Sequence, residues 1–344
     1  MKYEETFTFE NLYKSYLKAR KGKRWKNTTK KYEANALEYT YFLYYQLNTK
    51  TYTLGEYNEF YVYEPKKRLI KSLPFKDCVV QHCLCDYYLE DVLEPHFIYD
   101  NYASRKNKGT HKGLERLEEF LRRFYRKSNI NGYVLKCDIA KYFNSIDHDV
   151  LKRLLKKKVD EDELMELIET IVDSTPGTRG IPIGNQTSQL FAIYYMSEFD
   201  HYVKEKLKIK YYIRYMDDFI LIYEDKEYLK YCKNKIEEYL NEELKLELNK
   251  KTQIFPLKNG IDFLGFHTYI TSTGKVVRKI RKDSKERMKR KLKKFKKLYD
   301  CERITKDKID ASYNSWKGHA KHGNSYHLIR DMDEKYNSIF KKEW

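Results

Sequence analysis

The chain has 344 residues, 41% of them hydrophobic, which is enough for two or three packed subdomains. Lysine and arginine total 69 against 51 acidic residues, and this net charge of +18 favours a polyanionic partner, unless it reflects only a compositional bias. The six cysteines form no C-x-x-C pair, which argues against zinc ligands and a disulfide framework. Since no signal-peptide pattern and no apolar run of roughly 18 residues is present, we expect a soluble, cytoplasmic protein.

The first 50 residues are polar, basic and aromatic, with a cluster of cations at residues 20–26. Arg24 and Lys26 flank Trp25, so they could hold a phosphate backbone while the indole stacks on a base. A solvated basic helix is the alternative interpretation.

Residues 52–75 alternate in polarity and predict a hairpin, with strands at 60–63 and 68–74 around a turn at 64–67. Lys66, Lys67, Arg68 and Lys71 lie near its tip, which would suit a triphosphate, or would protect an exposed sheet edge from aggregation. Helical spacing follows at 77–93, then a cation-rich loop at 102–111 and a second helix.

A largely apolar strand is predicted at residues 132–139, and it ends near Asp138. Helices are expected at about 150–158 and 161–172. The glycine-bearing segment 180–189 then opens another helix, where small residues would let the backbone approach a ligand.

Asp217 and Asp218 lie between two apolar and aromatic runs, at the predicted turn of a hairpin over residues 211–222. Adjacent carboxylates repel each other, and both stay ionised most readily beside cations such as Mg²⁺. A solvated Asp-Asp turn is the alternative for this dipeptide taken alone.

Amphipathic helices are predicted at about 226–243 and 275–300, and the second has a strongly basic outer face. The tail at 312–323 mixes aromatic and basic residues.

These motifs together resemble a known family. Asp138 with Phe143, the Ile183–Gly184 and Ser188–Gln189 loop, the Tyr-Met-Asp-Asp run and Phe263-Leu264-Gly265 occur in the order found in reverse transcriptases. From about residue 52 onward the chain resembles bacterial reverse transcriptases related to group II introns. The resemblance implies an α+β right-hand polymerase with fingers, an antiparallel palm sheet backed by helices, and a helical thumb.

The implied organisation is a basic extension at 1–50, fingers with part of the palm at 51–137, a palm at 138–270 with a fingers insertion around 150–180, and a thumb at 271–344. Ile183 and Gln189 depart from most relatives, and in this they resemble the subgroup of diversity-generating retroelements. The subgroup implies copying of a template RNA into cDNA with errors at template adenines. It also implies dNTPs, a primer and a small basic accessory variability protein as partners.

The resemblance also implies roles for the three aspartates. Asp138 and Asp217 would hold two Mg²⁺ ions roughly 4 Å apart, together with the backbone carbonyl of Ile139, and Asp218 would give electrostatic support. The nucleotide-binding candidates are Arg68, Lys71, Arg105, Phe143, Ile183, Gly184 and Gln189, with Phe143 placed to exclude a 2′-hydroxyl. Lys251 is a candidate general acid or a solvated lysine. The candidate contacts to nucleic acid are Arg24, Lys26, Arg278, Lys282, Arg290, Lys294 and Trp316.

Two other interpretations stay open. The first is a retron-like, defence-associated or free-standing intron-derived reverse transcriptase. The second is a non-catalytic RNA-binding protein that retains a polymerase scaffold.

Overall fold

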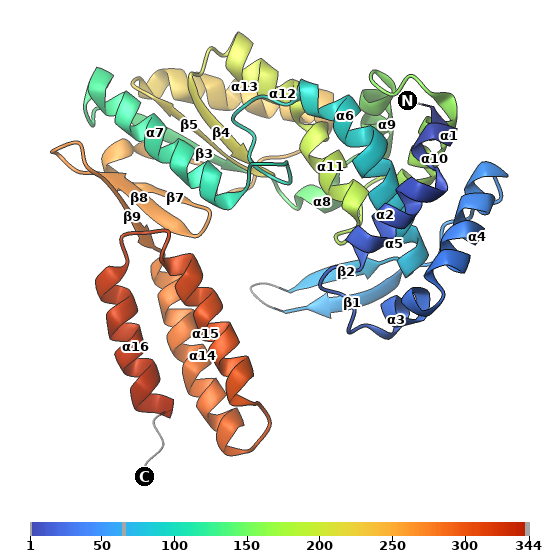
Figure 1. Ribbon diagram of the computed structural model, residues 1–344. Coiled ribbons are helices and arrows are strands. Elements are labelled where there is room, and N and C mark those ends of the chain that lie inside the picture. The colour runs from blue at the N-terminus through green and yellow to red at the C-terminus, as the bar shows by residue number, and fades with distance from the viewer. Residues whose placement is uncertain (1, 64–66, 341–344) are drawn as a thin grey trace.

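The computed structural model describes residues 2–63 and 67–340 of the chain (Figure 1). Its first fifty residues form helices rather than an extended arm. Their bounds are α1 (Tyr3–Thr6), α2 (Phe9–Ala19), α3 (Asn27–Ala34) and α4 (Ala36–Asn48). The buried side chains of Leu12 and Tyr16 fix α2 against the rest of the protein, so this extension is part of the main hydrophobic core.

The predicted hairpin is confirmed as two antiparallel strands, β1 (Asn58–Val62) and β2 (Arg68–Ser72). Most of the predicted turn, including Lys66, lies outside the described residues. The chain continues through α5 (Phe75–Leu84), the π-helix η1 (Cys85–Leu89), α6 (Glu90–Leu93), the short 3₁₀ helix η2 (Glu94–His96) and α7 (Thr110–Ser128).

A four-stranded antiparallel sheet with strand order β4-β5-β3-β6 forms the centre of the molecule (Figure 1). Its strands are β3 (Tyr133–Asp138), β4 (Tyr211–Tyr215), β5 (Asp218–Tyr223) and β6 (Gln253–Pro256). Alternate residues of β5 enter two different cores. Phe219 and Leu221 pack in the core that includes α13 (Lys226–Leu244), whereas Ile220 and Ile222 pack in the core that includes α7. The sheet is therefore buried on both faces, as its apolar strands predict.

Five helical segments connect β3 to β4. They are α8 (Tyr142–Ser145), α9 (His148–Lys156), α10 (Asp162–Val172), α11 (Gln186–Tyr195) and α12 (Ser197–His201), followed by the π-helix η3 (Tyr202–Lys206). The nearly continuous burial of α11 explains its apolar sequence on all sides, because it lies in the interior of the main core.

A second sheet of three strands follows the 3₁₀ helix η4 (Leu257–Asn259), with β7 (Ile261–Phe263), β8 (Phe266–Ile270) and β9 (Val276–Ile280). The predicted helix at 275–300 is wrong at its start, since the helix α14 (Lys282–Asp300) begins only at Lys282. Residues 276–280 instead pair with β8, and the β-branched Val276 and Ile280 fill the core beneath them.

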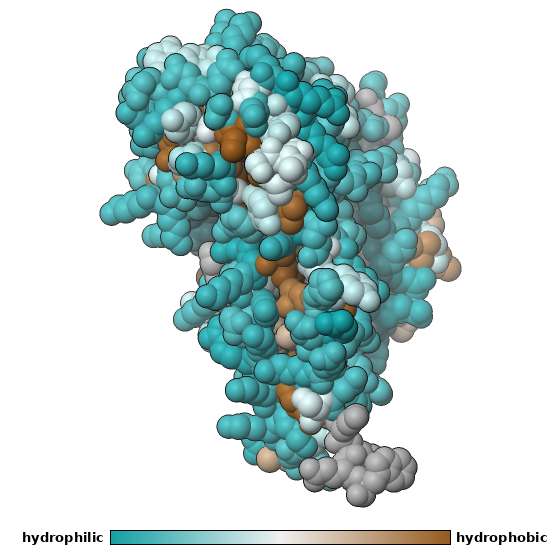
Figure 2. Space-filling view, turned by 90° about the vertical axis from the view of Figure 1, so that its left-hand side faces the viewer, coloured by the Kyte–Doolittle hydropathy of each residue, from teal (hydrophilic) through white to brown (hydrophobic). Residues whose placement is uncertain are grey.

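The C-terminal helices α14, α15 (Lys306–Ala320) and α16 (Tyr326–Phe340) pack together and extend away from the sheets (Figure 1). Viewed from the side that carries them, the surface is mostly hydrophilic, with hydrophobic residues in a band down its middle and in a smaller group at its right-hand edge (Figure 2). Across residues 2–63 and 67–340, no helix combines the length and apolar character needed to cross a membrane. This arrangement of hairpin, central sheet and helical end agrees with the expected α+β right-hand architecture.

Candidate active site

Three aspartates that are distant in the sequence meet at one end of the central sheet. Strand β3 ends at Asp138, and the antiparallel register places it opposite Asp218, the first residue of β5. The backbone N–H of Ile139 donates to the carbonyl of Asp217 at 3.2 Å. The carboxylates are thus brought together by strand pairing, which is the most rigid way a sheet can fix two side chains.

The tight turn between β4 and β5 depends on a left-handed residue. Met216 has φ +58°, which a non-glycine residue adopts at a cost and only where the surrounding structure holds it. Strand β4 is buried along four of its five residues, so the turn is held by the core below it. The turn places Asp217 next to Asp138 at the end of the two inner strands of the sheet.

Crowding and burial change the electrostatics of these carboxyls. Burial, followed by the charge of Asp138, raises the pKa of Asp217 above its ordinary value. Burial raises the pKa of Asp218 to about 6, although Lys136, whose Nζ lies 3.4 Å from Asp218 Oδ2, opposes this shift. The other oxygen, Asp218 Oδ1, is buried and has no hydrogen-bond partner among the residues that the structure describes. A bound cation would relieve both the repulsion and this missing contact.

The donor set fits a hard divalent ion that shares its ligands with a substrate. Asp138 and Asp217 could supply carboxylate oxygens, and Ile139, the next residue after Asp138, has a backbone carbonyl that is the third predicted ligand. Among the described residues, no group of three or more histidine, cysteine, aspartate or glutamate side chains is arranged to hold a metal by itself. Hard divalent cations such as Mg²⁺ can be held by one or two carboxylates, with water and substrate phosphates as the other ligands.

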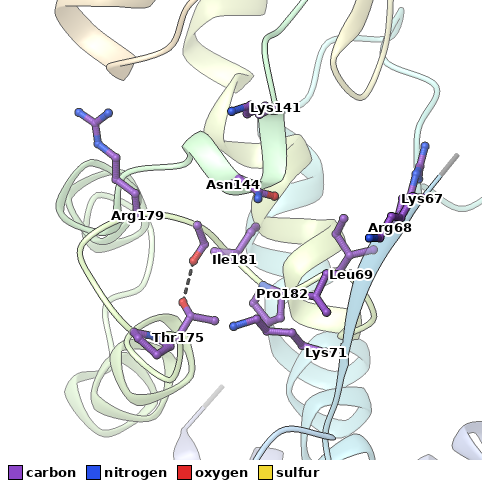
Figure 3. Close-up of a pocket in the computed structure, with 13 residues that line it drawn as sticks. Lys67, Arg68, Leu69, Lys71, Lys141, Asn144, Thr175, Arg179, Ile181 and Pro182 are labelled. Atoms are coloured by element: carbon purple, nitrogen blue, oxygen red, sulfur yellow. Dashed lines mark hydrogen bonds between the residues drawn. The ribbon is translucent and has the colours of Figure 1, made fainter. Parts of the chain in front are cut away.

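A cationic cavity of about 370 Å³ lies between the β1–β2 hairpin and the segments that follow β3 (Figure 3). Among the described residues, its lining contains five basic side chains and no acidic one: Lys67, Arg68, Lys71, Lys141 and Arg179. Figure 3 shows Lys67 and Arg68 on one side of the cavity and Arg179 on the opposite side. The positive charge of Arg68 partly opposes the rise in the pKa of Asp217, so this cation of the cavity interacts electrostatically with the aspartates. Such a lining suits a polyanion.

The predicted glycine loop forms one wall of this cavity. The N–H groups of Gly180 and Ile181 donate to the carbonyls of Ile146 and Phe143 at 2.7 and 2.9 Å, and the N–H of Lys71 donates to Ile183 at 3.3 Å. Gly184 has φ +133°, and a Cβ there would lie 3.0 Å from the carbonyl oxygen of Lys71. Glycine is therefore required for the loop to lie against β2.

Two basic residues of the cavity lining, Lys141 and Arg179, were not predicted from the sequence. Lys141 is an exposed residue in the left-handed conformation, φ +48°, three positions after Asp138. Arg179 is exposed and lies 3.7 Å from Asp147, which also pairs with Lys245 at 2.9 Å. The available signals were the position of Lys141 within the Asp138 motif and that of Arg179 immediately before the glycine loop.

The remaining nucleotide candidates, Arg105, Phe143, Gly184 and Gln189, are not among the residues that line the cavity. The half-buried Phe143 adjoins Asn144, which does line the cavity, and Gln189 accepts a hydrogen bond from Ser104 at 2.9 Å. Arg105 is turned inward, with its side chain 7% exposed and its guanidinium on Glu94 and on the carbonyls of Ile98 and Asn101.

Lys251 is exposed and follows Asn249 by two residues. The N–H of Asn249 donates to the carbonyl of Asp138, the last residue of β3, at 2.7 Å. Lys251 therefore lies near the site without a visible contact to the aspartates. Its assignment as a general acid stays a prediction.

The candidates for nucleic-acid contact divide by exposure. On α14, Lys282, Arg290 and Lys294 are exposed. Near the N-terminus, Arg24 is exposed, whereas Lys26 is half-buried and its ammonium lies 5.5 Å from the centre of the Trp25 ring. Two others point inward. Arg278 binds Glu118 and the carbonyl of Leu114, both at 2.9 Å, and Trp316 is 9% exposed and stacked on Tyr313. Arg278 therefore joins β9 to α7, and the Trp316 ring packs in the hydrophobic core that includes Tyr313.

Comparison with known proteins yields one family and a set of distant structures. The apo telomerase of Candida tropicalis truncated from its C-terminal domain aligns with 64% of this chain and 54% of that chain, at 16% identity and a TM-score of 0.46. The telomerase of Candida albicans in complex with a TWJ fragment of telomeric RNA aligns with 73% and 52%, at 14% identity and a TM-score of 0.48. The chain thus spans about half the length of these telomerases, and no curated protein matches it significantly. The family profile for reverse transcriptase (RNA-dependent DNA polymerase) matches residues 64–268, and the chain therefore belongs to the reverse transcriptase family.

Proposed function

We propose that the protein is an RNA-directed DNA polymerase that copies a template RNA into cDNA. The observation that carries the proposal is the meeting of Asp138 with Asp217 and Asp218 near a cavity whose charged lining residues, among those that the structure describes, are all cations. Phosphoryl transfer requires positioning and charge neutralisation more than covalent catalysis by the protein, and this site offers both. The match to the reverse transcriptase family supports the same activity.

In the proposed mechanism, Asp138 and Asp217 would hold the divalent ions, together with the backbone carbonyl of Ile139. When bound, these ions would act as Lewis acids on the primer 3′-hydroxyl and on the leaving pyrophosphate. Arg68, Lys141 and the other cations of the cavity neutralise the triphosphate and orient it towards the aspartates. Asp218 keeps a supporting role, because Lys136 partly balances its charge.

Phe143 and the glycine loop set selectivity in this proposal. The backbone carbonyl of Phe143 accepts a hydrogen bond from the N–H of Ile181, which joins the segment of Phe143 to the glycine loop that contains Ile183. The Phe143 ring would exclude a 2′-hydroxyl by steric contact. The template–primer duplex would lie against the basic face of α14, where Lys282, Arg290 and Lys294 reach its phosphates. The domain boundaries at about residues 50, 137 and 270 belong to the same proposal.

The finer assignment, a diversity-generating retroelement enzyme, rests on Ile183 and Gln189. Ile183 lines the cavity where a glutamine could donate a hydrogen bond, and isoleucine has no such donor. We therefore infer relaxed discrimination at template adenines, with a small basic accessory protein as partner. A retron-like or intron-derived enzyme is the competing assignment, and sequencing cDNA made from a known heteropolymeric RNA would separate the two by the presence or absence of adenine-directed errors.

The test of the activity is primer extension on oligo(dT)-primed poly(rA) with dTTP and Mg²⁺. The wild-type protein should extend the primer, and both Mg²⁺ removal and Asp217→Asn should abolish synthesis while RNA binding is retained. Extension by Asp217→Asn at the wild-type rate would refute the assignment of the site. Binding of the RNA by a wild-type protein that never extends the primer would favour a non-catalytic RNA-binding protein.

A further inference from the structure

The strand before the catalytic turn contains a fully buried arginine. Arg214 lies on β4, and its side chain and that of Asp200 on α12 are both 0% exposed. Its Nε and Nη2 donate to Asp200 Oδ1 and Oδ2 at 2.7 and 2.6 Å, which is a bidentate pair. Burying two charges costs free energy even when they are paired, and apolar side chains of similar volume could fill the same space without that cost. The arginine therefore calls for an explanation beyond packing.

The guanidinium also contacts two backbone carbonyls, which belong to different elements of the fold. Nη1 donates to the carbonyl of Met216 at 2.9 Å, and Nη2 donates to the carbonyl of Ile193 at 3.0 Å. Met216 is the left-handed residue of the turn and directly precedes Asp217. Ile193 belongs to the last turn of α11, whose carbonyls lack partners within the helix. One side chain thus joins the catalytic turn to the helix that follows the glycine loop.

The surroundings hold Arg214 itself in place. Tyr212 donates its hydroxyl to Asp200 Oδ1 at 2.6 Å, and the N–H of Arg214 donates to the carbonyl of Asp100 at 3.0 Å. Asp100 is in turn bound by Arg116 and Lys204, each at 2.8 Å. The guanidinium therefore has little freedom, and the position of the Met216 carbonyl is fixed relative to α11.

We propose that Arg214 is a positioning residue that sets the orientation of Asp217. Held by Asp200, its guanidinium binds the carbonyl of Met216 and fixes the position of that carbonyl relative to α11. The inference rests on the proposed role of Asp217 in the active site. Loss of the contact leaves the left-handed turn without its internal support and lets Asp217 shift relative to Asp138. A displacement of about 1 Å in a reacting group costs up to about a hundredfold in rate.

The test compares two variants of the same buried network. Arg214→Lys keeps a cation for Asp200, but a single ammonium on a flexible stem cannot bind Asp200, Met216 and Ile193 together. Tyr212→Phe is the matched control, because it removes one hydrogen bond to Asp200 and leaves the Met216 carbonyl untouched. Both are assayed on oligo(dT)-primed poly(rA), with kcat normalised by active-site titration and the thermal midpoint measured in parallel.

For Arg214→Lys we expect kcat per active site to fall by about 10- to 100-fold, with KM for dTTP and Kd for the template–primer within about twofold of wild type. For Tyr212→Phe we expect kcat within about twofold at a comparable loss of thermal midpoint. Equal kcat per active site in both variants, or a rise in KM alone, would overturn the proposal.

If Arg214→Lys does not fold, Arg214→Gln with Asp200→Asn removes both buried charges together, and the same outcomes apply. The proposed active site is judged separately in this experiment. DNA synthesis by Asp217→Asn at the wild-type rate would contradict the role of Asp217 itself. Synthesis that is lost in Asp217→Asn but unaffected in the arginine variants would contradict only the positioning role of Arg214.

Discussion

Replacing Asp218 by asparagine is expected to stabilise the metal-free protein at neutral pH. One carboxyl oxygen is buried without a hydrogen-bond partner, and burial raises the pKa from 3.8 to about 6, with Asp138 and Asp217 adding to the shift. At pH 7 the folded protein thus holds a charge that its environment disfavours, whereas the unfolded chain ionises the same group freely. Asparagine has nearly the same shape and no charge.

The magnitude follows from the difference between the two pKa values. A shift of about 2 units at 1.36 kcal/mol per unit sets an upper limit of about 3 kcal/mol. Since 27% of the side chain remains exposed, screening by solvent reduces this to about 1–2 kcal/mol. A folded-state pKa above the unfolded value means that the penalty is absent below about pH 4, grows between about pH 4 and 6, and is complete above that range.

Urea denaturation in EDTA at pH 4 and pH 7 measures this difference directly. Asp218→Asn should exceed the wild type in free energy of unfolding at pH 7 and equal it near pH 4, and Mg²⁺ should remove the advantage at pH 7. Asp331→Asn, at an exposed position on α16, serves as the control and should show no such pH dependence. A variant that gains equally at both pH values, or not at all, refutes the electrostatic account.

Three further variants test the proposed nucleotide-binding site. Phe143→Val should admit ribonucleotides, which extension with rUTP in place of dTTP on the same template would detect; an unchanged preference removes the steric role. Ile183→Gln should improve discrimination at template adenines by about 1–3 kcal/mol in ΔΔG‡, measured by sequencing cDNA, and an unchanged error spectrum counts against it. Lys141→Ala with Arg179→Ala should raise KM for dTTP about tenfold or more with little change in the Kd of the template–primer, and an unchanged KM places the triphosphate elsewhere.

The polymerase motifs could be identified from the sequence because each consists of neighbouring residues. The turn at Asp217 and Asp218 is visible in the order of apolar strands around two acids, and the end of β3 at Asp138 is visible in its apolar run. The strand register that brings them together is a consequence of the hydrophobic pattern on both faces of the sheet. For the same reason the β1–β2 hairpin was predicted correctly.

Features that depend on contacts between distant segments could not be predicted in the same way. Arg214 has no local signal that separates it from a surface arginine, because its burial depends on Asp200, Met216 and Ile193. The strand β9 was interpreted as part of a helix, because its cations continue the basic pattern of α14 while its pairing partner is β8. Arg278 and Trp316 were assigned to the surface by composition, although they are fixed by contacts with other elements.

The central claim is that Asp138 and Asp217 jointly hold divalent ions beside the triphosphate. Its most direct test is anomalous scattering from Mn²⁺ in crystals of the protein with template RNA, a primer that lacks its 3′-hydroxyl, and a dNTP. The account predicts Mn²⁺ peaks within coordination distance of carboxylate oxygens of both aspartates, with the triphosphate against Arg68 and Lys141. A bound nucleotide with Mn²⁺ peaks away from these two aspartates would contradict it.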